Sequence, residues 1–193
     1  MSIAARVRIL GVETLSHDWG VLKKTTFEYR RNDGSWQKQS RETYDRGHAA
    51  TILLYNLAQR TVILTQQFRY PAFVMGHDAL LLETPAGLLD DATPEARIHA
   101  ETEEETGYRL REPRKVFDAF MSPGSVTEKL TFYVCAYEPQ DKVSGGGGIA
   151  SEGEDIDTLE VPFADAMAMI TDGRILDAKT IMLLQHAALT IFR

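Results

Sequence analysis

The segment Pro94–Tyr108, PEARIHAETEEETGY, decides how the rest of the chain is interpreted. It predicts a short helix, because Thr93 suits the N-cap, Pro94 the first helical position and Gly107 the C-terminal stop. A helix C-terminus carries a partial negative charge, so each acidic side chain there is unfavourable by roughly 0.3 kcal/mol or more. A solvated acidic face is the simpler interpretation, but it does not explain why four carboxylates gather at this end: Glu101, Glu103, Glu104 and Glu105.

The spacing of two of these glutamates favours a metal site. Glu101 and Glu105 are four residues apart, so they lie on one face of the helix and repel each other unless a cation lies between them. The segment Glu83–Asp91, ETPAGLLDD, precedes the helix and would present exposed backbone carbonyls beside them. Mg²⁺ takes few protein ligands and leaves the rest to water and to substrate phosphates. The pattern therefore predicts phosphate chemistry.

Composition limits the class of protein. The chain has 193 residues, 44% hydrophobic and 25% charged, which favours one soluble globular domain with at most a small appended subdomain. A net charge of -7 without a basic tract excludes a nucleic-acid polymer as partner, but not a small anionic substrate. Cys135 stands alone and suits a buried strand. We find neither a secretory signal nor an apolar run of about 18 residues, so we expect a cytoplasmic protein without a membrane partner.

Hydrophobic patterning predicts a small sheet followed by a larger α+β domain. RVRILGVE, VLKKTTFEYR and SWQKQSRETYD alternate like strands, and Asn32-Asp33-Gly34 marks a turn between the last two. This antiparallel sheet needs a second surface, since small sheets are marginal alone. Further strands are expected at 48–56, 61–70, 79–87, 115–120, 129–137 and 156–162, and Pro85 and Gly87 end the strand within 79–87. Helices are expected at 163–173 and 177–192, and a mobile glycine-rich loop at 138–155. The fold class is α+β or a mixed α/β/α sandwich.

The acidic helix also carries a family resemblance. GLLDDATPEARIHAETEEETGY resembles the Nudix box, in which a glycine is followed at a distance by Arg-Glu-x-x-Glu-Glu-x-Gly, and AETEEETGY is the specific part. The match departs at Thr93, where the family has glutamate, and at Ala100, where it usually has the arginine that orients the box carboxylates. The segment from Gly87 to Glu101 is also one residue shorter than the usual box.

Other segments are similar to the nucleotide-sugar branch of that family. They are YDRGHAATILLYN, QQFR, LLETPAGLLDD, MSPGSVTE, EGEDIDTLEVPF and DAKTIMLL. Together they resemble the GDP-mannose pyrophosphatase group, with ADP-ribose pyrophosphatases as near relatives. The resemblance implies a Nudix α/β/α sandwich with a mixed sheet at 46–193 and an antiparallel sheet subdomain at 1–45. It also implies a homodimer whose N-terminal sheets exchange, so that each serves its partner's site.

The resemblance further implies a set of site residues. Metal ligands for Mg²⁺, with Mn²⁺ as an alternative, would be the backbone carbonyl of Ala86 and the carboxylates of Glu101, Glu105 and Glu154, with Glu104 in support. The general base would be Glu128 or the Glu154–Asp155 pair; otherwise Glu128 is a strand-edge surface charge and the pair belongs to a solvated loop. Implied substrate contacts are Trp19, Ser40, Arg41, Glu42, Arg69, Gly87 and Lys179. Trp19 could instead pack in a core or interface.

The activity implied is Mg²⁺-dependent attack of water on the diphosphate of a nucleoside diphosphate-sugar. GDP-mannose would give GMP and mannose 1-phosphate. The alternative substrate is ADP-ribose, giving AMP and ribose 5-phosphate. A different class, motivated by Thr93 and Ala100, is a domain that binds nucleotide sugars without catalysis.

Overall fold

The computed structural model describes residues 2–193, which form two compact units. The first unit holds the described residues up to His48 together with Phe120–Lys129. The second unit holds Ala49–Ala119 together with Leu130–Arg193. Within the described residues, no helix is both long enough and apolar enough to cross a bilayer.

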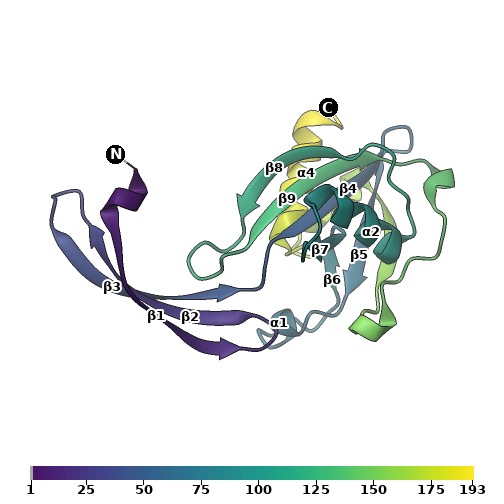
Figure 1. The fold of residues 1–193 in the computed structure, drawn as a ribbon. Coiled ribbons are helices and arrows are strands. Elements are labelled where there is room, and N and C mark those ends of the chain that lie inside the picture. The colour runs from purple at the N-terminus through teal and green to yellow at the C-terminus, as the bar shows by residue number, and fades with distance from the viewer. Residues whose placement is uncertain (1) are drawn as a thin grey trace. The chain divides into compact units, whose positions relative to one another are not determined.

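The first unit is a three-stranded antiparallel sheet that follows a 3-10 helix, η1 (Ile3–Arg6) (Figure 1). Its strands, in spatial order, are β1 (Val7–His17), β2 (Val21–Arg30) and β3 (Trp36–Asp45). The predicted turn at Asn32-Asp33-Gly34 joins β2 to β3, and Gly34 takes the left-handed φ of 88° that favours glycine. The expected hairpin is therefore confirmed, while β1 runs longer than predicted.

One strand of this sheet leaves apolar side chains uncovered. Ile9, Leu10, Val12 and Leu15 on β1 are all exposed. The segment 120–129 attaches at β3 instead, where Tyr44 N donates to Ser125 O at 2.8 Å and Thr127 N donates to Tyr44 O at 3.1 Å. The sheet thus carries an apolar surface that the described chain does not bury.

The second unit is built on a mixed sheet of seven strands in the order β10-β5-β4-β9-β8, with β6 paired to β5 and β7 to β4. β4 runs antiparallel to β5 and parallel to β9. The strands are β4 (Ala49–Asn56), β5 (Thr61–Gln67), β6 (Leu81–Glu83), β7 (Ala86–Leu88), β8 (Arg114–Phe120), β9 (Lys129–Ala136) and β10 (Asp157–Pro162).

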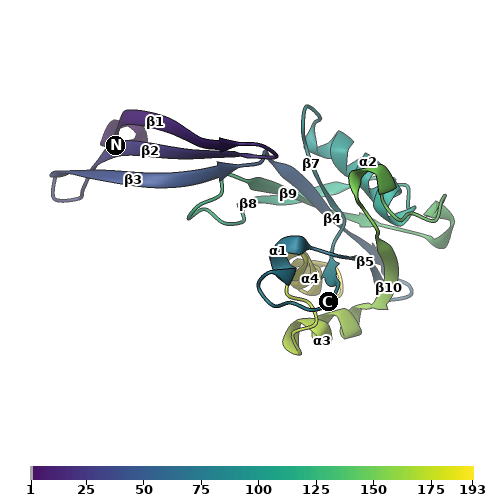
Figure 2. The same ribbon diagram turned by 90° about the horizontal axis from the view of Figure 1, so that it is seen from below.

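Helices cover both faces of this sheet (Figure 2). On one face α2 (Pro94–Thr106) buries Ile98 against Ile52 and Leu54 of β4 and Ile63 of β5. On the other lie α3 (Phe163–Thr171) and α4 (Ala178–Thr190), and α4 contacts β4 and β6. Every residue of β4 except Tyr55 is buried, as expected of a strand covered on both sides. The predicted α/β/α sandwich with a mixed sheet is confirmed.

Prolines account for two differences from the predicted strands. The strand expected at 61–70 ends at Gln67, and Tyr70–Phe73 forms the helical turn α1 with Pro71 in its first positions. Pro85, which cannot donate to a sheet, divides the strand expected at 79–87 into β6 and β7. Short 3-10 helices, η2 (Pro139–Asp141) and η3 (Ala150–Glu152), lie within the predicted loop.

Candidate functional site

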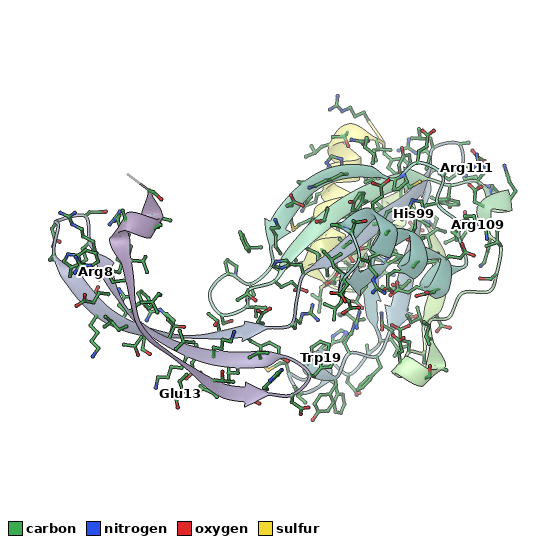
Figure 3. All side chains as sticks on the ribbon, in the orientation of Figure 1. Arg8, Glu13, Trp19, His99, Arg109 and Arg111 are labelled. Atoms are coloured by element: carbon green, nitrogen blue, oxygen red, sulfur yellow. The ribbon has the colours of Figure 1, made fainter. Side chains whose placement is uncertain are left out.

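The acidic helix α2 begins and ends as its sequence predicts. The side chain of Thr93 accepts a hydrogen bond from Ala96 N at 3.2 Å, and Gly107 ends the helix in the left-handed region with φ of 76°. The last turn contains no basic residue that would offset the glutamates. Glu103 is partly exposed and forms a two-point ion pair with Arg109 beyond the helix end. Figure 3 shows Arg109 in this position.

Glu101 and Glu105 point from α2 toward the sheet. Glu105 is buried, and its Oε2 has no hydrogen-bond partner among the described residues. The Glu101 side chain lies directly over the Cα of Gly87 on β7, where any Cβ would overlap it. Because Gly87 has no side chain, the Glu101 carboxylate can lie next to the backbone of β7, which also contains Ala86. The structure brings together the helix carboxylates and the strand that carries the predicted carbonyl ligand.

The glycine-rich segment docks on the end of α2 and is not the free loop that its composition predicts. Gly147 N donates to Glu105 O and Gly148 N donates to Glu104 O, each at 3.0 Å. These bonds satisfy carbonyls that a helix C-terminus leaves without partners. Gly146 is packed so tightly that a Cβ would lie 2.5 Å from Glu105 O.

Docking of this segment also positions Glu154. Its Oε2 accepts a hydrogen bond from Ile149 N at 2.8 Å, directly after the glycines. A Cβ at Gly148 would lie 2.6 Å from the same oxygen. The interpretation of Glu154 as a freely solvated loop charge is therefore wrong, because a backbone N–H holds its carboxylate in place.

The charges of these carboxylates act on one another. The pKa of Glu101 is raised to about 7, mainly by burial. Arg97 lowers this pKa, while the charges of Glu104 and Glu154 raise it. Burial also raises the pKa of Glu105 well above its ordinary value, and Glu101 and Glu154 add to this. Glu101, Glu105 and Glu154 are therefore within electrostatic range of one another, and we call these three side chains the carboxylate cluster; Glu104, which also acts on Glu101, is exposed.

The carboxylate cluster suits a divalent cation that also binds water and substrate. Within residues 2–193, no three His, Cys, Asp or Glu side chains already stand where they could hold a metal ion together. The buried Glu105 Oε2 nevertheless lacks a donor, and like charges surround it. A hard cation bound by few carboxylates, with other positions left to water and phosphate, would satisfy both conditions. The residues present therefore fit Mg²⁺ or a similar ion.

Arg97 is a residue of the site that sequence reasoning missed. Its Nη1 lies 3.4 Å from Glu101 Oε1 and its Nη2 lies 2.8 Å from Asp90 Oδ2. The spacing of four residues between Arg97 and Glu101 was the available signal. Arg97 thus provides a cation for Glu101 although Ala100 occupies the usual arginine position.

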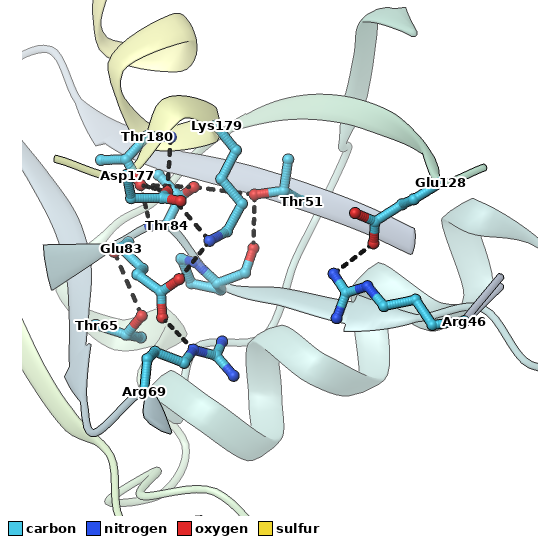
Figure 4. Close-up of polar contacts among 11 residues, drawn as sticks. Arg46, Thr51, Thr65, Arg69, Glu83, Thr84, Glu128, Asp177, Lys179 and Thr180 are labelled. Carbon is cyan, nitrogen blue, oxygen red and sulfur yellow. Dashed lines mark hydrogen bonds and ion pairs between the residues drawn. The ribbon is translucent and has the colours of Figure 1, made fainter. Parts of the chain in front are cut away.

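Two predicted substrate cations meet at one buried carboxylate (Figure 4). Arg69 Nε donates to Glu83 Oε2 at 2.8 Å, and Lys179 Nζ donates to Glu83 Oε1 at 2.6 Å. Burial raises the pKa of Glu83, but Lys179 and Arg69 lower it more, so the net pKa lies below its ordinary value. Arg69 also lowers the pKa of Glu105, which places this cationic group within electrostatic range of the carboxylate cluster.

The remaining predicted residues lie in the first unit. Trp19 is at the β1–β2 turn and 67% exposed, so it is not a core residue of the chain (Figure 3). Ser40, Arg41 and Glu42 are exposed on β3 and line an open hollow of about 310 Å³ together with Lys24 and Gly124.

Glu128 also belongs to the first unit. It is buried, and its Oε1 accepts a hydrogen bond from Arg46 Nη2 at 2.5 Å (Figure 4). The interpretation of Glu128 as a surface charge is therefore wrong.

Comparisons with known proteins show which proteins this chain is similar to. Residues 6–44 match the family model described as GDP-mannose pyrophosphatase NudK N-terminal domain. The chain is 51% identical over 186 residues to a GDP-mannose pyrophosphatase of Pectobacterium atrosepticum, covering 96% of this chain and 95% of the relative. It is 47% identical over 191 residues to one of Yersinia pestis, covering 98% and 96%. A crystal structure of an ADP compounds hydrolase superimposes with a TM-score of 0.72 at 18% identity, covering 97% of both chains.

Proposed function

Because the chain belongs to the GDP-mannose pyrophosphatase family of Nudix hydrolases, we propose that it hydrolyses GDP-mannose to GMP and mannose 1-phosphate. The observation that supports this most is the cluster of Glu101, Glu105 and Glu154 beside Ala86, with Arg69 in electrostatic range. Such a site combines acidic groups for a metal ion with a cation for a diphosphate.

The cofactor in this proposal is Mg²⁺, with Mn²⁺ as an alternative. Its ligands would be the Ala86 carbonyl and the carboxylates of Glu101 and Glu105. When bound, the ion neutralises phosphoryl oxygens and lowers the pKa of the attacking water. Glu105→Gln tests this assignment by calorimetric titration of Mg²⁺ into the protein. We expect weaker Mg²⁺ binding and loss of most activity in a folded protein, and unchanged binding would contradict the assignment.

The side chains of the protein would supply a general base and a cation that stabilises developing charge. Glu154 is the proposed base, because its Oε2 is held by Ile149 N and its Oε1 is left to accept the proton of water. Glu128 remains the alternative base, and Glu104 a supporting carboxylate. Arg69 would donate hydrogen bonds to the diphosphate and stabilise the charge that develops on the leaving phosphate.

A panel of nucleoside diphosphate-sugars tests the function. Wild-type protein with Mg²⁺ is incubated with GDP-mannose, ADP-ribose and other members, and released sugar phosphate is measured. We expect the highest kcat/KM with GDP-mannose. Equal or faster turnover of ADP-ribose would replace the substrate assignment. Tight binding without hydrolysis at any Mg²⁺ concentration would instead indicate a non-catalytic binding domain.

The proposal also covers the oligomeric state and the cellular location of the protein. We propose a cytoplasmic homodimer in which residues 1–45 form the dimerisation subdomain and residues 46–193 the hydrolase domain. Trp19 and the stretch Ser40–Glu42 would then serve the site of the partner subunit. The exposed apolar residues of β1 support this arrangement, since they need a covering surface. Light scattering of the purified protein at micromolar concentration tests it, and a monomeric mass would refute the dimer.

A further inference from the structure

Three buried threonines from separate parts of the chain form a connected set of hydrogen bonds. Thr51 of β4, Thr84 between β6 and β7, and Thr180 of α4 are each at most 1% exposed. Thr51 Oγ1 lies 2.9 Å from Thr84 Oγ1, which in turn lies 3.3 Å from Thr180 Oγ1. We call these three residues the threonine network, and Figure 4 shows them together.

The hydroxyl protons of the network have one consistent arrangement, because each hydroxyl donates only once. The Thr180 hydroxyl donates to Asp177 Oδ2 at 2.6 Å, and Thr180 Oγ1 accepts from Thr84 N at 2.7 Å. The Thr51 hydroxyl donates to Pro85 O at 3.0 Å. The Thr84 hydroxyl therefore donates to Thr51, the nearer of its two neighbours. The network thus runs from the N-cap of α4, which is Asp177, to the carbonyl of Pro85.

The carbonyl of Pro85 accepts two hydrogen bonds. Besides the Thr51 hydroxyl, Ile52 N donates to it at 3.1 Å. Pro85 has no N–H, and the sheet is interrupted between β6 and β7 at this position. The two donors from β4 therefore fix the plane of the peptide bond that joins Pro85 to Ala86.

Ala86 directly follows this peptide plane, and its own carbonyl is the backbone ligand in the proposed Mg²⁺ site. On its other side Gly87 pairs with Ala50 of β4. A backbone fixed on both sides leaves the Ala86 carbonyl little freedom to turn. Mg²⁺ demands near-ideal octahedral geometry with ligands at about 2 Å, so a ligand that can turn away weakens its binding.

We propose that the threonine network positions the Ala86 carbonyl for Mg²⁺, and that Thr51 is the positioning residue that contacts this part of the backbone. The inference deepens the proposed function, on which it rests. Residues that hold the ligands of a metal ion typically change the metal affinity about 10- to 100-fold when they are removed. Thr51 belongs to this class because it binds the peptide next to the ligand.

A competing interpretation gives the threonine network a stabilising role alone. Buried hydroxyl groups need hydrogen-bond partners, and three threonines that satisfy one another would meet this need without acting on a ligand. Removal of the Thr51 hydroxyl would then lower the unfolding temperature and leave the affinity for Mg²⁺ unchanged.

Ca²⁺ separates a displaced ligand from a lost charge. It accepts more oxygen ligands than Mg²⁺ in a more flexible geometry. A displaced carbonyl should therefore weaken the binding of Mg²⁺ more than that of Ca²⁺, whereas loss of a carboxylate charge should weaken the binding of both ions.

The test is calorimetric titration of Mg²⁺, and separately of Ca²⁺, into the wild type, Thr51→Val and Thr51→Ser. Valine keeps the branched shape of threonine, and Pro85 O keeps its bond from Ile52 N, so we expect Thr51→Val to fold. It should raise the Kd for Mg²⁺ about tenfold and the Kd for Ca²⁺ at most about threefold. Serine retains the hydroxyl and should restore the affinity for Mg²⁺.

Thr65→Val is the matched control. The Thr65 side chain is as buried as that of Thr51 and donates to a different carbonyl, Glu83 O, at 3.3 Å. Its replacement should leave the Kd for Mg²⁺ unchanged. Glu105→Gln removes the charge of a proposed ligand and should weaken the binding of both ions. If Thr51→Val fails to fold, Thr84→Val removes the donor to Thr51 and should raise the Kd for Mg²⁺ about threefold.

Three results would each overturn the proposal: an unchanged Kd for Mg²⁺ in Thr51→Val, equal weakening of Mg²⁺ and Ca²⁺ binding, or the same loss in Thr65→Val. If the wild type does not bind Mg²⁺, the metal assignment of the proposed function fails and this inference fails with it. If the wild type binds Mg²⁺ and hydrolyses GDP-mannose while Thr51→Val binds Mg²⁺ normally, only this inference fails.

Discussion

Replacing Glu101 by glutamine should stabilise the metal-free protein at neutral pH. Burial is the main reason that the pKa of Glu101 rises to about 7, and neighbouring carboxylates contribute while Arg97 opposes the rise. In the unfolded chain the same carboxyl ionises near its ordinary value of 4.5. Between these two values the folded state holds a proton that the unfolded state has lost. Stability of the metal-free protein therefore falls as pH rises through this window.

The size of the effect follows from the two pKa values. A tenfold difference in proton affinity corresponds to about 1.4 kcal/mol, so ionisation of Glu101 removes about 3 kcal/mol by pH 8. The side chain is only 13% exposed, so screening by water is limited. The pKa of about 7 already includes the opposing effect of Arg97, so glutamine, which keeps the shape without the charge, should gain about 3 kcal/mol at pH 8. For a chain of this length that gain corresponds to roughly 6 to 12 °C in unfolding temperature.

Thermal unfolding of wild type and Glu101→Gln in EDTA at pH 5, 6, 7 and 8 measures this directly. Groups common to both proteins cancel in the difference, so the two unfolding temperatures should nearly coincide at pH 5 and separate toward pH 8. Mg²⁺ should then stabilise the wild type more than the variant, since a ligand stabilises the state that binds it. A difference that does not change with pH, or a wild type that is the more stable protein at pH 8, would refute the reasoning.

Three further substitutions test how the site is held. Gly87→Ala places a methyl group where the Glu101 side chain lies, and the displaced carboxylate should lower kcat about 100-fold in steady-state assays. Arg97→Met removes the ion pair with Glu101 and should lower kcat roughly tenfold, with partial recovery in Arg97→Lys. Gly146→Ala strains a backbone at φ of 69° against the Glu105 carbonyl and should cost about 2 kcal/mol in denaturant unfolding.

Matched controls exist for each substitution. An added Cβ meets no atom within 4 Å at Gly11 or Gly145, so alanine at these positions should change activity and stability little, within about 0.5 kcal/mol. Arg109→Met removes an exposed ion pair with Glu103 and should leave kcat unchanged. If a control variant loses as much activity or stability as the variant it is matched to, the effect does not come from the contact that the variant removes or crowds.

Some elements could be predicted because short-range interactions determine them. The ends of α2 depend on Thr93, Pro94 and Gly107, all next to the helix they bound. The β2–β3 turn depends on Asn32-Asp33-Gly34, where glycine adopts a positive φ without strain. The prolines at 71 and 85 also act locally: Pro85 is expected from the sequence to end its strand, and Pro71 was available as a reason to shorten the strand at 61–70.

The residues that can carry the chemistry follow from the sequence alone, since carboxylates four apart on a helix share a face wherever the helix packs. Which of these charges meet depends on the fold. Glu83 binds Lys179 across 96 residues, and the docked glycine segment holds Glu154 within electrostatic range of Glu101 and Glu105. Long-range packing also buries Glu105 and raises its pKa. Desolvation and pairing of charges depend on neighbours that the fold supplies, and local sequence does not encode them.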